Sequence, residues 1–271
     1  MNYKFLLELA VKAALKAGED ILKIYATDFF IETKSDNTPV TLADKAASKR
    51  IVAVLSESGY PVISEEEIIS NYEVRKTWDY LWMVDPLDGT KEFIKRNGEF
   101  AVNIALIEKN KPVIGVIYTP VFKEVYYAYT GYGSYKYTFG SAAPQTDTRN
   151  WFEDLIHSSG KLPFERSPKN YTVVASRSHL SREINLHLEQ LKNIYGEVDI
   201  IYTGSSLKQG WVAEGRAHEY TRFGTTMEWD TAAGQCILEE AGKKLIDLQT
   251  EKPMRYNKER LENNFFSARC N

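Results

Sequence analysis

The segment from Leu81 to Gly89 constrains the fold more than any other part of this chain. It begins with four apolar residues, Leu81 to Val84, which have the composition of a buried strand, and it continues into Asp85 and Asp88. A buried strand does not normally end in paired carboxylates unless a cation or a strong hydrogen-bond donor neutralises them. The segment therefore predicts a strand that leads directly into a polar site.

A second cluster of acids follows another short apolar run. Residues 61–63 lead through Ser64 into three consecutive glutamates, 65–67. Such runs are usually solvated surface, and the second and third glutamates fit that interpretation. Glu65 differs, because a preceding strand would place it beside Asp85. Two strand ends rich in oxygen predict a site for a hard metal ion, which prefers oxygen ligands.

Composition limits the class of protein and of ligand. The chain has 271 residues, 43% hydrophobic and 26% charged, as expected of a soluble globular protein with one large or two small domains. A net charge of -3 disfavours binding of nucleic-acid polymers but is compatible with small anionic substrates. Two cysteines, Cys236 and Cys270, and four scattered histidines lack zinc-ligand spacing, so any metal is expected to bind through oxygen.

The sequence also bears on location. No apolar run approaches the length of a membrane span, and the charged N-terminus does not resemble a signal peptide. The expected location is the cytoplasm; peripheral association at the inner face of the cell membrane and the oligomeric state are left open.

Apolar periodicity predicts layered helices and strands in the first half. One face of a long N-terminal helix carries the apolar residues Leu6, Leu9, Ala10, Ala13, Ala14, Ala17, Ile21 and Ile24. A second helix is predicted to begin near Thr41. Runs rich in β-branched and aromatic residues at 101–107, 113–118 and 125–129 then predict a strand meander over one side of these helices.

The pattern changes beyond residue 136. Residues 137–170 are polar and rich in turn-forming residues, which predicts a long connection or surface excursion. Strands and helices then alternate, at 172–175, 182–192, 198–202, 207–214 and 230–241. The expected architecture is an N-terminal half, 1–136, and a C-terminal half, 171–271, within one compact α+β domain.

The turn after the apolar run has the groups that would hold a phosphate and its metal. Asp85 and Asp88 can point into one cavity, and the carbonyl of Leu87 is available as a further ligand. Gly89 and Thr90 would open a short helix whose first amides can receive phosphate. Magnesium takes about six oxygen ligands, several from water or substrate. The alternative is an ordinary Asx-type turn between a strand and a helix.

Two other acids have equally ordinary alternatives. Asp230 precedes a run of small residues, 231–234, that would press it against neighbouring elements, but by itself it is a plain helix N-cap. Asp44 follows Thr41 at the spacing of a capping box, whereas the functional interpretation makes it the partner that orients an attacking water. For Asp44, nothing local separates the two alternatives, whereas Asp230 taken alone fits the N-cap better.

Three separated motifs together resemble one known family. Residues 82–93, with Glu65 and Glu66 upstream and residues 229–234 downstream, resemble the inositol monophosphatase superfamily. Within it, residues 91–100 resemble the CysQ-type 3'(2'),5'-bisphosphate nucleotidase branch. Further matching segments are 34–41, 176–179 and 204–208, so the resemblance spans the chain from about residue 5 to residue 268.

The resemblance implies a layered αβαβα sandwich and hydrolysis of phosphate monoesters that depends on two or three Mg²⁺ ions. The implied metal ligands are Glu65, Asp85, the carbonyl of Leu87, Asp88 and Asp230. Asp44 and Thr90 are implied to activate the attacking water. The implied substrate contacts are Glu65, Leu87, Asp88, Gly89, Thr90, Arg177, Ser205, Lys208 and Asp230.

The branch resemblance implies removal of the 3'-phosphate from adenosine 3',5'-bisphosphate. Arg177, Ser205 and Lys208 would then meet the 5'-phosphate or the ribose, although Lys208 is equally read as an exposed helix residue and Ser205 as part of a capping turn. A short spacing between Asp44 and Glu65, and the length of segment 137–170, depart from the family pattern and bear on nucleotide preference. Alternatives are an inositol monophosphatase or sugar bisphosphatase, and a non-catalytic protein that senses nucleotides or metal ions.

Overall fold

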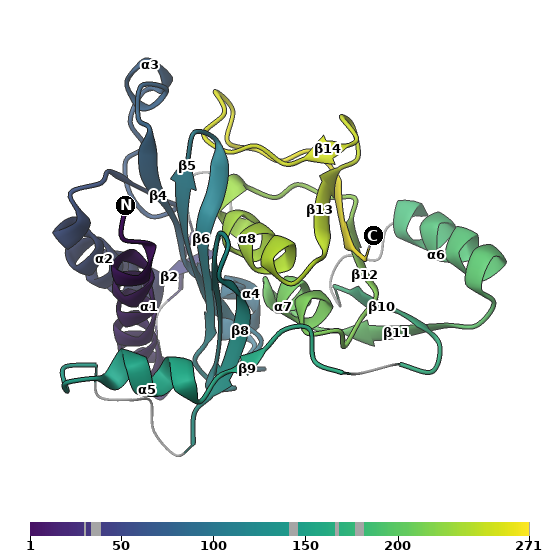
Figure 1. Cartoon of the computed structure of the whole chain (residues 1–271), viewed down its shortest axis with the longest axis horizontal. Coiled ribbons are helices and arrows are strands. Elements are labelled where there is room, and N and C mark those ends of the chain that lie inside the picture. Colours follow the sequence, from purple (N-terminus) through teal and green to yellow (C-terminus); the bar gives the residue numbers. More distant parts are fainter. Residues whose placement is uncertain (30, 34–38, 141–145, 166–167, 177–181, 271) are drawn as a thin grey trace.

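Five layers of helix and sheet make up the molecule. The computed structural model describes residues 1–29, 31–33, 39–140, 146–165, 168–176 and 182–270. Two N-terminal helices cover one face of a seven-stranded sheet, and two further helices separate that sheet from a six-stranded one. A last helix covers the outer face of the second sheet (Figure 1). The predicted α+β layered sandwich is therefore confirmed.

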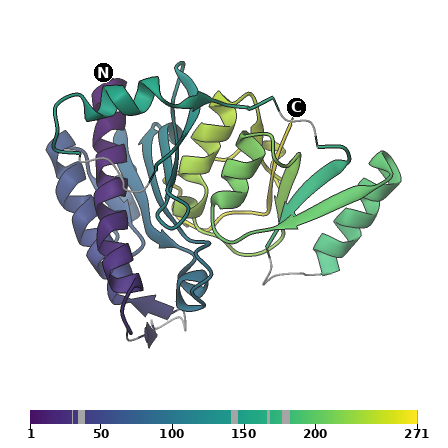
Figure 2. The same ribbon diagram turned by 90° about the horizontal axis from the view of Figure 1, so that it is seen from below.

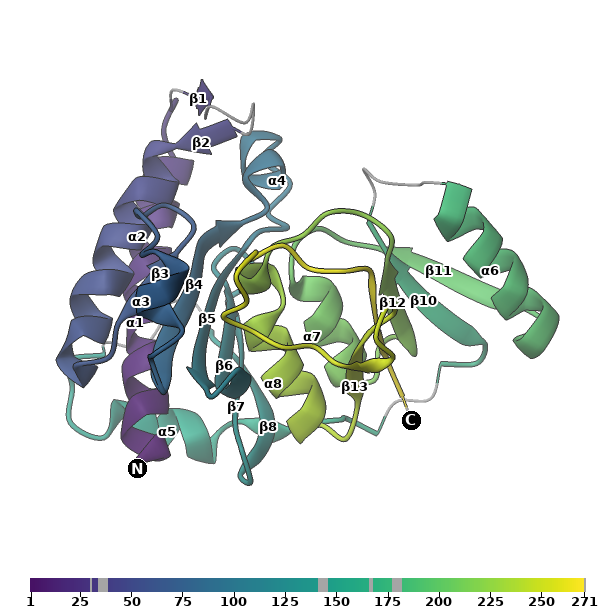
Figure 3. The same ribbon diagram turned by 90° about the horizontal axis from the view of Figure 1, so that it is seen from above.

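The outer N-terminal layer consists of α1 (Tyr3–Tyr25) and α2 (Leu42–Leu55). The apolar face predicted for the first helix is buried, including Ala10, Ala14 and Ile21 at 0% exposure, except that Ile24 at its end is only partly buried. The antiparallel pair of β1 (Ile31–Thr33) and β2 (Pro39–Thr41) comes between the two helices in the sequence and lies beyond their ends in space (Figure 3). There β2 contacts α4 (Thr90–Ile94), the helix that follows the acidic motif.

The seven-stranded sheet brings the two predicted acidic strand ends together. Its strands, in spatial order, are β3 (Val62–Ser64), β4 (Tyr80–Asp88), β5 (Ala101–Glu108), β6 (Lys111–Thr119), β7 (Glu124–Tyr129), β8 (Gly133–Thr138) and β9 (Gly160–Lys161). β3 runs parallel to β4, with Ser64 opposite Val84, and the other neighbours are antiparallel. Glu65 thus follows its strand at the same edge as Asp85.

One detail of β4 differs from the sequence prediction. The strand continues through the acidic turn to Asp88, rather than ending at Asp85. Asp85 pairs with Asn103 and Asp88 with Ala101, so one extra residue is accommodated between the two aspartates as a β-bulge. A bulge redirects the side chains that follow it, which explains how two acids three residues apart both serve one site.

Segment 137–170 is not only a polar connection. It contains α5 (Trp151–His157), which crosses α1 near the N-terminus (Figure 2). Its Trp151, Phe152 and Leu155 are buried in the same core cluster as the apolar residues of α1. The sequence prediction missed this helix because its surroundings are rich in Ser, Gly, Pro and Asp. The division of the domain into halves at this segment stays a prediction.

The second half contains the inner helices and the six-stranded sheet. Its helices are α6 (Arg182–Tyr195), α7 (Leu207–Ala213) and α8 (Ala232–Glu240). Its strands, in spatial order, are β11 (Val198–Tyr202), β10 (Tyr171–Ala175), β12 (Glu219–Arg222), β15 (Phe266–Arg269), β13 (Lys244–Asp247) and β14 (Lys252–Pro253). Nowhere in the described ranges is a helix long and apolar enough to cross a membrane.

The inner helix α8 lies very close to the first sheet. A Cβ atom at Gly115, in the middle of β6, would stand 2.2 Å from the carbonyl oxygen of Ala233, so only glycine permits this approach. The contact holds the start of α8, and with it the turn that carries Asp230, against the strands that carry the other acids.

Candidate active site

The bulged end of β4 directs two carboxylates into the space between the sheets. Asp85 is 2% exposed and accepts a hydrogen bond from the amide of Leu87 at 3.1 Å. Asp88 is held from two other elements, because its Oδ2 accepts from the amide of Ser206 and from Asn103 Nδ2, the latter at 3.3 Å. The predicted alternative of an ordinary turn accounts for the first bond but not for the second pair.

Two further carboxylates join this pair. The amide of Glu65 donates to the carbonyl of Val84 at 3.2 Å, which fixes Glu65 beside the end of β4. Asp230 lies in the 3-10 turn η2 (Glu228–Asp230), where its Oδ2 accepts from the amide of Met227 at 2.8 Å. Since α8 begins at Ala232 with Thr231 as its N-cap, Asp230 does not cap that helix as the alternative proposed.

The electrostatics of the four acids favour a cation. Burial, together with the charges of Glu65, Asp88 and Asp230, raises the pKa of Asp85 well above its usual value. Burial and the charge of Asp88 likewise raise the pKa of Asp230. Within the described ranges, no group of three or more Asp, Glu, His or Cys side chains is arranged so that it could hold a metal ion by itself. What the acids share is a mutual repulsion that a divalent cation with oxygen ligands would relieve, so the donor set fits Mg²⁺.

Asp44 satisfies both interpretations that the sequence left open. Its Oδ2 accepts from the amide and the hydroxyl of Thr41, at 2.7 and 2.6 Å, which is the predicted capping box. Its Oδ1 accepts from the hydroxyl of Thr90 at 3.1 Å. The carboxyl is 3% exposed, and burial raises its pKa. The Thr90 hydroxyl also has the carbonyl of Leu87 as an acceptor, at 3.4 Å, but Asp44 is the nearer and charged one. With its proton directed at Asp44, the lone pairs of the hydroxyl are available to a water.

The backbone before Thr90 requires glycine. Gly89 has φ of +97° and precedes α4 as its N-cap, and a Cβ at this position would lie 3.2 Å from the carbonyl oxygen of Glu99. The left-handed conformation is strained for other residues. It turns the chain sharply after the bulge and places Thr90 beside Asp44.

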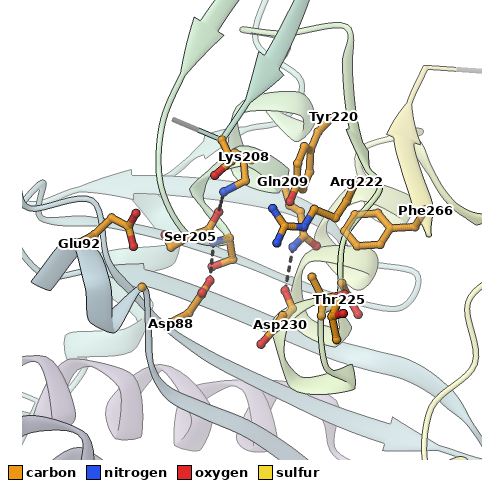
Figure 4. A pocket seen from close by; sticks show the side chains of 15 residues that line it. Asp88, Glu92, Ser205, Lys208, Gln209, Tyr220, Arg222, Thr225, Asp230 and Phe266 are labelled. Atoms are coloured by element: carbon orange, nitrogen blue, oxygen red, sulfur yellow. Dashed lines mark hydrogen bonds between the residues drawn. The ribbon is translucent and has the colours of Figure 1, made fainter. Parts of the chain in front are cut away.

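A cavity of about 150 Å³ opens beside these acids (Figure 4). It is lined by residues of both halves, among them Asp88, Gly89, Glu92, Ser205, Lys208, Gln209, Tyr220, Arg222, Asp230 and Phe266. Of the substrate contacts that the resemblance implied, five line this cavity. Glu65, Leu87 and Thr90 lie outside its lining, and Arg177 lies outside the described residues.

Lys208 is not the exposed helix residue of the alternative interpretation. It is 5% exposed, and its Nζ donates to the carbonyl of Ser205 at 2.5 Å (Figure 4). Burial lowers the pKa of Lys208 to about 8, and the charge of Arg222 acts in the same direction, whereas Asp88 opposes it. The Ser205 hydroxyl accepts a hydrogen bond from the amide of Leu207 at 3.3 Å, as expected of a residue in a capping turn. Ser205 also lines the cavity, so both interpretations of this residue apply.

Sequence reasoning missed a second cation in the cavity. Arg222 ends β12, and its guanidinium extends into the cavity towards Gln209, away from Phe266 (Figure 4). Its Nε is buried and has no hydrogen-bond partner among the described residues. No local motif marks this arginine, because its approach to Lys208 arises only from the packing of β12 beside α7. Glu92 also lines the cavity, and its position in the 91–100 motif was the available signal.

Comparisons with known proteins agree with the geometry. The chain is 43% identical over 249 residues to the 3'(2'),5'-bisphosphate nucleotidase CysQ of Salmonella typhimurium, an alignment covering 90% of this chain and 91% of that protein. It is 41% identical to the protein of the same name from Escherichia coli strain K12, covering 93% and 94%.

Solved structures show the same arrangement. CysQ from Bacteroides thetaiotaomicron, described as a bacterial member of the inositol monophosphatase family, superposes with a TM-score of 0.91 at 46% identity, covering 99% of this chain and 98% of that one. An inositol monophosphatase from Anabaena shares the fold, with a TM-score of 0.69 at 23% identity and coverage of 99% and 92%. The model of the inositol monophosphatase family matches residues 2–265. The chain therefore belongs to the inositol monophosphatase family.

Proposed function

We infer that this protein hydrolyses the 3'-phosphate of adenosine 3',5'-bisphosphate with one water, giving AMP and inorganic phosphate. The observation that carries the inference is the polarity of the site, which has carboxylates at one end and the two cations Lys208 and Arg222 at the other. A bisphosphate requires both ends, since the phosphate being cleaved needs metal and the second phosphate needs a cation. The names of the similar CysQ proteins support this substrate class.

The acidic end would hold the metal. Members of the family are metal-dependent phosphatases, generally using Mg²⁺. We assign two or three Mg²⁺ ions to Glu65, Asp85, Asp88, Asp230 and the carbonyl of Leu87. When bound, such ions neutralise phosphate charge and make a water easier to deprotonate.

Asp44 and Thr90 would orient the attacking water. Because the Thr90 hydroxyl donates to Asp44 at 3.1 Å, it can accept a proton from water only through its lone pairs. As the water gives a proton to the Thr90 oxygen, the hydroxyl would release its original proton to the Asp44 carboxylate, whose pKa is raised by burial. The backbone of Gly89 and Thr90 would lie against the phosphate that is cleaved.

The basic end would select the nucleotide. Lys208 and the Nε of Arg222, which has no partner in the described part of the chain, would provide charged donors for the 5'-phosphate. Ser205 lies between these cations and Asp88, where it would meet the ribose. Arg177 is proposed as a further contact of the same phosphate.

A phosphate-release screen tests this function. Adenosine 3',5'-bisphosphate, inositol monophosphates and fructose bisphosphate are compared with and without Mg²⁺, and with Asp85→Asn as the inactive control. We expect Mg²⁺-dependent release that Asp85→Asn abolishes, and a preference for the nucleotide of at least tenfold in kcat/KM, or about 1.4 kcal/mol. Full activity in EDTA, or a tenfold preference for inositol or sugar phosphates, would contradict it. Binding in calorimetry without phosphate release over hours would favour the sensing protein.

A further inference from the structure

Glu228 opens the 3-10 turn that presents Asp230, and it is entirely buried, with 0% exposure. Burying a carboxylate costs desolvation free energy, which lowers the stability of the fold unless strong hydrogen-bond donors surround the group. Glu228 has three such donors, all from one segment near the C-terminus. Its Oε2 accepts from the amide of Asn257, and its Oε1 accepts from the amide and the Nζ of Lys258, at 3.0 and 2.6 Å.

Asn257 connects Glu228 by hydrogen bonds to Arg75, in the N-terminal half of the molecule. Its Oδ1 accepts from Arg75 Nη1, and its Nδ2 donates to the Arg75 carbonyl, both at 2.8 Å. A second donor of the same guanidinium, Nη2, bonds the carbonyl of Glu259 at 2.7 Å. Asn257 has φ of +62°, a left-handed conformation that asparagine tolerates better than most residues. The arginine is 3% exposed, so the pairing is shielded from water.

Arg75 ends the short helix α3 (Tyr72–Arg75), which connects β3 to β4. Glu65 directly follows β3 and β4 carries Asp85 and Asp88, whereas Glu228 belongs to the turn that carries Asp230. Figure 3 shows the segment after β14 crossing from the second sheet towards the first. One buried network therefore connects the two elements that supply the acidic end of the site.

We propose that Glu228 is a positioning residue that fixes Asp230 for metal binding, with Asn257 and Arg75 tying the turn to the β3–β4 connection. The proposal rests on the proposed function, because it takes Asp230 as a metal ligand. Replacement by glutamine preserves the shape of the side chain but turns an NH₂ group towards a backbone N–H. The turn must then lose a hydrogen bond or shift, and Asp230 follows it two residues later. Losing a partner that orients a ligand weakens metal binding about 10- to 100-fold.

Calorimetric titration with Mn²⁺ alone tests the proposal, without reliance on turnover. The proteins are the wild type, Glu228→Gln, Asp230→Asn and the double variant. We expect Glu228→Gln to weaken Mn²⁺ binding at least about tenfold. In the Asp230→Asn background the same change should alter affinity less than about twofold, since residues that act through one another are not additive.

Glu214→Gln is the matched control. Glu214 is another buried carboxylate, 1% exposed, that accepts from Lys136 Nζ at 2.8 Å and from the Tyr126 hydroxyl at 3.2 Å, and it does not line the cavity. We expect Glu214→Gln to lower the thermal stability about as much as Glu228→Gln does, but to leave the affinity for Mn²⁺ unchanged. If both buried-acid variants weaken Mn²⁺ equally, Glu228 acts only through stability and the proposal fails.

The outcomes separate this proposal from the proposed function. If Asp230→Asn binds Mn²⁺ as tightly as the wild type, Asp230 is not a metal ligand, and the proposed function fails in the form given above. Weak binding in Asp230→Asn with wild-type binding in Glu228→Gln overturns the positioning role alone. If Glu228→Gln does not fold, Lys258→Met replaces it in the titration, because this change removes one of the three donors to Glu228. We expect Lys258→Met to weaken Mn²⁺ binding about threefold when Asp230 is present and not in the Asp230→Asn background. Unchanged Mn²⁺ affinity in Lys258→Met would refute the proposal.

Discussion

Replacing Lys208 with alanine removes a buried ammonium group from the basic end of the cavity. A charge-assisted hydrogen bond contributes about 1.5–3 kcal/mol. In the free protein Lys208 already bonds the carbonyl of Ser205 at 2.5 Å, and Arg222 remains after the substitution. Both facts reduce the loss, so we expect about 2 kcal/mol, which corresponds to about a thirtyfold change in affinity.

The assay compares two substrates that differ only in the second phosphate. Steady-state rates are measured with adenosine 3',5'-bisphosphate and with adenosine 3'-monophosphate, at pH 7 and saturating Mg²⁺. Lys208→Ala should raise KM about thirtyfold for the first and less than about threefold for the second, with kcat little changed. Lys208→Arg keeps the charge and is the control. Equal effects on both substrates would refute the reasoning, because Lys208 would then not contact the 5'-phosphate.

Three further predictions concern acid–base behaviour and stability. With a pKa of about 8, Lys208 is cationic below that pH and neutral above it, so KM for the bisphosphate should rise between pH 7 and 9 in steady-state assays; a flat profile that Lys208→Arg does not alter would exclude this role. Thr90→Ala should lower kcat about a hundredfold or more with KM nearly unchanged, and Thr90→Ser should restore activity if the hydroxyl relays the proton to Asp44. Phe152→Ala should destabilise the fold by about 3–5 kcal/mol in urea unfolding, because Phe152 is 2% exposed; a loss below about 1 kcal/mol would make segment 137–170 a surface excursion after all.

Asp44 shows why local patterns leave function open. Its capping box and its contact with Thr90 use different oxygens of one carboxylate, so the structural and functional interpretations never competed. The spacing from Thr41 predicted the first contact. The second joins residues 44 and 90, and no spacing rule covers such a separation.

Lys208 and Arg222 also show that a local pattern does not predict the surroundings of a side chain. A lysine in the first turn of a helix is exposed or buried according to what packs on that turn, and here α7 lies between two sheets. The pKa shift of Lys208 and the approach of Arg222 both follow from this burial. Conversely, α5 was missed because turn-forming neighbours hide a helix that only its contacts with the core stabilise.

The sequence by itself determined the helices and strands with strong periodicity, the layered α+β class, and the acidic motif at Asp85 and Asp88, since each depends on residues within a few positions of one another. The strand before Glu65 likewise predicted its place beside Asp85. Only the tertiary structure decided that the charge of Asp230 acts on Asp85, that Lys208 is buried beside Arg222, and that Glu228 is held by Asn257 and Lys258. These contacts join residues far apart in the chain, and burial gives them their electrostatic strength. Both depend on how the layers pack, which no local pattern encodes.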